Sequence, residues 1–173
     1  MKIRYTFLIF FFTIFVNAQV KNIIEKKGDN SNDVYRLDED KEMDNAIICA
    51  KKSLSQFDIA LKSNDTILKH FCLKKPFKTP MGEEHIWISS IMYSTKLKKY
   101  IGILGNEPLY AKNIKKDDII EIDIDEISDW SYLEVNKSNH YKLIGGYTTR
   151  LLVSRMSKSE RKDFDENSGL IIE

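Results

Sequence analysis

The segment EHIWISSIMY, residues 84–93, carries the pattern that decides the fold. Ile86 and Ile88 alternate with polar or aromatic residues, which is the two-residue period of a β-strand with two different faces. A second apolar run at residues 100–104 comes after a polar loop around residues 94–98. So short a connection favours antiparallel pairing. The sequence therefore predicts two neighbouring antiparallel strands.

Three further runs have the composition of strands, namely residues 70–77, 120–125 and 141–144. In the second run, isoleucine alternates with aspartate and glutamate, so one face should be buried while the other meets water. Pro76 places the end of the first run at a sheet edge or a turn, because proline cannot donate to a ladder. These runs together predict a twisted, curled antiparallel sheet.

An apolar stripe with helical spacing precedes the strands. Its members recur every three or four residues and are Met43, Ile47, Ala50, Leu54, Phe57 and Leu61. This pattern predicts a long helix from about Glu42 to Leu61, capped by Asp38 or Asp40. Phe57 and Leu54 should pack that helix against the sheet.

Shorter helices are predicted near the end of the chain. Residues 148–156 fit either a helix or a strand, and the helix is favoured by the segment on their C-terminal side. The sequence SKSE, residues 157–160, fits a capping box and predicts a helix over residues 158–164, ended by Asn167 and Gly169. The predicted fold class is α+β, with a curled antiparallel sheet, a long N-terminal helix and short C-terminal helices.

The first eighteen residues have the composition of a secretion signal. Lys2 and Arg4 precede an apolar run at residues 5–16, and Ala18 is a small residue at the expected cleavage point. A membrane anchor is the alternative, but the run is shorter than the roughly 20 residues that span a bilayer. The sequence predicts export to the periplasm or the medium, with no stable membrane span after the signal is removed.

The mature chain divides into three parts. Residues 19–40 are rich in Lys, Asp, Asn and Ser and contain few large apolar residues, so they are predicted to be a flexible tether. Residues 41–166 are predicted to form one α+β domain, and residues 167–173 a tail.

The charge balance excludes one class of partner. Loss of Lys2 and Arg4 would leave 25 basic residues against 26 acidic ones. Nucleic-acid binding depends on clustered positive charge, so it is not expected here.

Cys49 and Cys72 are two cysteines in a chain predicted to reach an oxidising compartment. Both a disulfide and two free thiols, one of them a small buried apolar side chain, remain open.

Five motifs occur in a recognisable order: EHIW at 84–87, LGNEP at 104–108, ISDW at 127–130, GGYTxR at 145–150 and RMSxxER at 155–161. In this order they resemble the bacterial YegJ-like family, domain of unknown function 2314, and the similarity covers about residues 43–165. The family has no established activity. The resemblance therefore implies no particular reaction, cofactor or partner.

The first three of these motifs lie at ends of strand-like runs, where binding groups are commonly presented. We therefore predict a non-enzymatic binding or accessory module that contacts an unknown protein or small ligand. The predicted binding residues are Trp87, Asn106, Glu107, Asp129 and Trp130. In the alternative in which helices cover both faces of the sheet, Trp87 and His85 are structural residues, and the three motifs are separate turn and packing devices.

A small hydrolase is the competing function, with His85 as a general base beside a carboxylate such as Glu107. No nucleophile stands at a recognisable spacing, so no catalytic residue is predicted.

Seven acids at residues 117–129 suggest calcium, but they lack the glycine and the later glutamate of an EF-hand loop. No metal or other cofactor is predicted. Gly145 and Gly146 ahead of Arg150 fit either an anion site at a helix start or a simple turn.

Overall fold

The computed structural model describes residues 40–80, 82–136 and 140–172. The predicted signal peptide, residues 1–18, and residues 19–39 of the predicted tether lie outside this described part. Among the described residues, no helix is both long and apolar enough to cross a bilayer.

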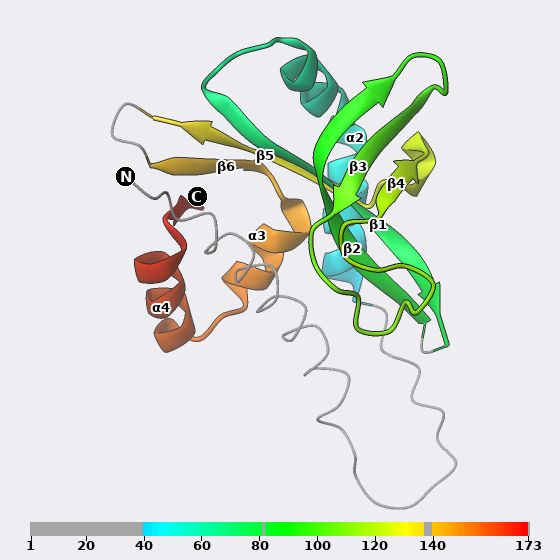
Figure 1. The fold of residues 1–173 in the computed structure, drawn as a ribbon. Helices are drawn as coiled ribbons and strands as arrows, with labels where there is room; N and C mark the ends of the chain where they lie inside the picture. Colours follow the sequence, from blue (N-terminus) through cyan, green and yellow to red (C-terminus); the bar gives the residue numbers. More distant parts are fainter. Residues whose placement is uncertain (1–39, 81, 137–139, 173) are drawn as a thin grey trace, which may run out of the picture.

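The described residues form an α+β fold with one sheet (Figure 1). The elements are α2 (Lys41–Lys62), β1 (Leu68–Thr79), β2 (Gly82–Ser94), β3 (Lys99–Leu104), β4 (Ile119–Ile122), the 3-10 helix η1 (Ile124–Glu126), β5 (Asp129–Val135), β6 (Tyr141–Gly145), α3 (Tyr147–Ser154), α4 (Lys158–Ser168) and β7 (Leu170–Ile171). The strand order is β4-β3-β2-β1-β5-β6-β7.

The sheet is mixed, whereas the sequence predicted an antiparallel one. All neighbouring strands pair antiparallel except β6 and β7, which run parallel. The β7 strand has only two residues and lies in the segment predicted to be a tail. A run this short has no periodic pattern from which a strand could be predicted. The predicted curl of the sheet stays a prediction.

The long helix is confirmed. Asp40 is its N-cap, and one carboxylate oxygen of Asp40 accepts a hydrogen bond from the backbone N–H of Met43 at 3.1 Å. Phe57 has no exposed surface and contacts the rings of Phe71, Tyr100 and Trp130. In Figure 1 the cyan helix α2 crosses behind β1, β2 and β3, so it covers one face of the sheet.

The side chains on the face under α2 are almost fully buried. Ile86 and Ile88 from β2 have exposures of 1% and 0%. A bulge between Ser89 and Met92 inserts one residue, and Ser90 takes a positive φ of 54° there. Because of this insertion, Ile91 also faces the core, although the simple alternation from Ile88 would place it on the other side.

The helices α3 and α4 lie at the β5 and β6 end of the sheet (Figure 1). Val153 of α3 and Phe164 of α4 pack with Leu133 and Leu143, which face away from α2. The predicted capping box is present, with Ser157 and Glu160 each accepting from the other's backbone. The helix α4 is longer than predicted and ends at Gly169, whose φ is 66°.

Replacing Phe57 with alanine tests the core. We expect Phe57→Ala to lower the free energy of unfolding by about 3 to 5 kcal/mol, the range for truncating a large buried aromatic side chain. Urea titration followed by far-UV circular dichroism measures the change. Ile59→Ala is the matched control, since Ile59 lies on the same helix with 71% exposure and should change stability by less than about 0.5 kcal/mol. Equal effects of the two substitutions would contradict the packing.

Candidate functional site

The side chain of Asp129, the first residue of β5, lies at the N-terminus of α3. Its carboxylate accepts hydrogen bonds from the backbone N–H of Trp130 at 2.8 Å and of Thr148 at 2.8 Å, from the Thr148 hydroxyl at 2.6 Å, and from the backbone N–H of Tyr147 at 3.2 Å. Asp129 has no exposed surface. The first N–H groups of a helix attract an anion, and here the chain supplies that anion itself.

Lys74 balances this buried carboxylate. It pairs across the sheet with Trp87 on β2 and with Asp129 on β5, so the three side chains lie in one row on the face opposite α2. The Lys74 Nζ donates to the Thr148 hydroxyl at 3.2 Å and lies 5.6 Å from the centre of the Trp87 ring. Lys74 is only 4% exposed.

Burial changes the pKa of both charged groups in this row. It lowers the pKa of Lys74 to about 8, and the nearby Asp129 carboxylate opposes that fall. Burial also raises the pKa of Asp129, while the hydrogen bonds from Thr148 and the charge of Lys74 act in the other direction. Each group therefore reduces the cost of burying the other.

Trp130 follows Asp129 directly but faces the core under α2. Its Nε1–H donates to the carbonyl oxygen of Ala50 at 2.9 Å, and its ring packs on Phe57. The backbone of Gly145 crosses this ring so closely that a Cβ atom there would lie 2.4 Å from the Trp130 carbonyl oxygen. Arg150 donates to the carbonyl oxygens of Gly145 and Leu143. The glycine pair thus ends β6 and leads directly into α3, whose first N–H groups donate to Asp129.

Asn106 and Glu107 lie in the loop after β3. Asn106 is 6% exposed, and its Oδ1 has no hydrogen-bond partner among the described residues. Glu107 is exposed, and its Oε2 accepts from the backbone N–H of Lys116 at 3.1 Å. Sequence reasoning did not assign a role to Glu84, whose carboxylate accepts from three consecutive backbone N–H groups at residues 109–111. The contacts span 25 to 27 residues, and no local pattern indicates them.

His85 contacts a serine. Its Nδ1 lies 2.9 Å from Ser128 Oγ, and that hydroxyl donates to the carbonyl oxygen of Lys74 at 3.1 Å. A hydroxyl has one proton, so His85 Nδ1–H is the donor in the tautomer in which Ser128 donates to the Lys74 carbonyl. Ser128 is 3% exposed.

Burial lowers the pKa of His85 to about 4, with smaller contributions from the charges of Lys74 and Lys51. The imidazole is therefore neutral at pH 7. The Nε2 of His85 lies 3.8 Å from the carboxylate of Glu83. The carboxylate of Glu107 instead accepts a hydrogen bond from the backbone N–H of Lys116. The predicted pair of His85 with Glu107 is thus not among the described contacts, and the hydrolase alternative stays a prediction.

The acidic run is partly paired with lysines. Lys99 lies 3.5 Å from Glu121 and 3.1 Å from Asp123, and Lys75 lies 2.7 Å from Glu126. Within residues 40–80, 82–136 and 140–172, no group of three or more His, Cys, Asp or Glu side chains is placed to hold a metal ion. Cys49 is exposed and Cys72 is buried, and both are free thiols.

An exposed apolar strip, which we call the open face, runs across β2, β3 and β4 on the side opposite α2. It consists of Trp87, Met92, Ile101, Ile103 and Ile119. Met92, Ile103 and Ile119 are 62%, 39% and 75% exposed, and the other two are half-buried. The helices α3 and α4 lie at the other end of the sheet (Figure 1). Within the described part of the chain, the strip is the continuation of the row that holds Lys74 and Trp87.

We expect Asp129→Asn to destabilise the fold and Glu107→Gln to leave it nearly unchanged. An amide at position 129 presents an N–H group to other donors and removes the charge opposite Lys74, which should cost about 1 to 3 kcal/mol. Glu107 is exposed, and glutamine keeps an acceptor oxygen, so the change should stay within about 0.5 kcal/mol. Thermal melting measures both. Unchanged melting of both variants, with loss of an identified partner, would instead favour the shared recognition site predicted from the sequence.

Comparison with known proteins agrees with the motif order. The model of the family described as uncharacterised proteins conserved in bacteria, DUF2314, matches residues 40–171. The uncharacterised YegJ protein of Escherichia coli strain K12 is 30% identical over 118 residues, which cover 68% of this chain and 71% of that protein. A putative ankyrin repeat protein of Neisseria meningitidis serogroup B is 33% identical over 87 residues, or 50% of this chain and 32% of that protein. No solved structure matches significantly.

Proposed function

This chain belongs to the DUF2314 family of uncharacterised bacterial proteins, and we propose that it is an exported, non-enzymatic binding module that contacts a protein partner through the open face. One observation carries the proposal. The strands β2, β3 and β4 bury their side chains almost completely on the face that α2 covers, and they expose large apolar side chains on the opposite face. Exposed contiguous apolar surface on a soluble domain commonly marks an interaction site.

Trp87 is the residue of the predicted set that best fits a direct contact. It is half-buried, and the Lys74 ammonium lies over its ring, so its position is fixed before any partner arrives. Fixed aromatic side chains are frequent at the centres of protein interfaces. Asp129 and Trp130 are buried and support this surface through the position of β5. Asn106 and Glu107 follow the end of β3 and would lie at the rim.

A crosslinking experiment tests the surface. A photoreactive amino acid replaces Ile103 in the chain expressed in its native host, and the same substitution at Ile59 on α2 serves as the control. Ile59 is 71% exposed against 39% for Ile103, so accessibility alone would favour the control. We expect a discrete adduct with a second protein at position 103 and none at position 59. Equal labelling at the two positions, or none at 103, would refute the open face as the contact surface.

Export is tested separately. The charged start and the apolar run predict cleavage after Ala18. Mass spectrometry of the protein purified from its native host should therefore find Gln19 at the N-terminus, in the fraction outside the cytoplasmic membrane. A soluble cytoplasmic protein that retains Met1 would show that the first residues are not a signal.

A further inference from the structure

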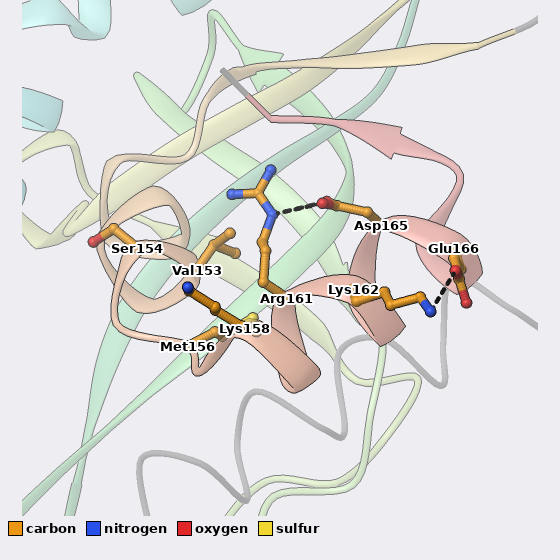
Figure 2. A pocket seen from close by; sticks show the side chains of 8 residues that line it. All are labelled: Val153, Ser154, Met156, Lys158, Arg161, Lys162, Asp165 and Glu166. Atoms are coloured by element: carbon orange, nitrogen blue, oxygen red, sulfur yellow. Dashed lines mark hydrogen bonds and ion pairs between the residues drawn. The ribbon is translucent and has the colours of Figure 1, made fainter.

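An open groove of about 550 Å³ lies between the end of α3 and one side of α4 (Figure 2). Val153 and Met156 contribute its apolar part. Ser154 of α3 also lines it, and the other lining residues lie on α4 at helical spacing, namely Lys158, Arg161, Lys162, Asp165 and Glu166. The volume falls within the range of small-ligand sites. None of the sequence-predicted binding residues lines this groove.

The charges along α4 are unequally satisfied. The Nε of Arg161 donates to both carboxylate oxygens of Asp165 at 2.8 and 2.9 Å, and Lys162 lies 3.8 Å from Glu166. Lys158 has no hydrogen bond or ion pair among the described residues, and it is exposed at the first position of α4. The helix dipole also favours negative charge at that end.

Arg161 retains donor capacity beside Lys158. Its Nη2 donates to the carbonyl oxygen of Ile172 at 3.2 Å and its Nε to Asp165, which leaves Nη1 without a hydrogen bond in the described part of the chain. Figure 2 shows the Lys158 amino group and the Arg161 guanidinium directed to either side of Val153. Lys158 and Arg161 are three positions apart on α4, so they project from the same side of the helix, and a carboxylate between them would have Val153 and Met156 beside its apolar remainder.

We propose that this groove binds a small carboxylate with an apolar tail. The carboxylate is held by Lys158 and Arg161, and the tail lies along Val153 and Met156. A single negative charge fits better than a dianion such as a phosphate monoester, because Asp165 and Glu166 line the same groove and would repel the second charge. The proposal is independent of the open face, which lies on other elements.

Titration of the full chain with octanoate, below the concentration at which octanoate forms micelles, tests this site. Two-dimensional amide NMR should show shifts confined to α3 and α4. Acetate lacks the tail and 1-octanol lacks the charge, so both should bind at least about tenfold more weakly, the order expected when one charge-assisted hydrogen bond or the apolar contact is lost.

Lys158→Gln should weaken octanoate binding about tenfold, since it removes the charged donor. Lys96→Gln is the control, because Lys96 is an exposed lysine in the β2 to β3 turn and should bind octanoate as the unaltered chain does. Thermal melting of both variants should match the parent, since neither side chain is buried. Equal affinity for octanoate and 1-octanol, unchanged affinity of Lys158→Gln, or no octanoate binding would overturn the proposal.

Discussion

The buried carboxylate of Asp129 is the contact on which the arrangement of sheet and helices depends. Asp129 is the first residue of β5. Its carboxylate accepts hydrogen bonds from the start of α3 and lies near Lys74 of β1. Three elements far apart in the sequence are thereby fixed at one point. Removal of one of the two charges leaves the other buried without compensation and therefore destabilises the fold. The contacts of Asp129 with Lys74 and with α3 therefore constrain the fold directly.

Trp130 extends that constraint to the other side of the sheet. Successive residues of a strand face opposite ways, so Asp129 holds α3 on one side while Trp130 packs under α2 on the other. The close passage of Gly145 over the Trp130 ring then leaves no room for a side chain, and the positive φ of 71° also favours glycine. At its far end, α3 carries Arg155, which pairs with Asp40 and Glu42 at the start of α2. These ion pairs join α3 to α2, against which it also packs.

What the sequence predicted correctly is local in origin. The stripe of α2, the alternation of β2 and the capping box of α4 are all set by residues within a few positions of one another. What it missed depends on distant partners. Asp129 was predicted as a binding residue, and the sequence did not indicate that it starts β5 and that its carboxylate accepts hydrogen bonds from residues 18 and 19 positions later. Because polar side chains at strand ends serve either recognition or packing, their roles cannot be separated before the register is known.

The open face is the feature that this core does not explain. The large apolar side chains under α2 pack together in the main core, and the bulge at Ser90 keeps Ile91 on that side. Polar residues at positions 103 and 119 would satisfy the same strand pairing at lower cost in water. Instead, isoleucines stand there beside a tryptophan held by a buried lysine. This exposed apolar surface, placed next to a tryptophan ring held by Lys74, is the observation on which the proposed contact rests.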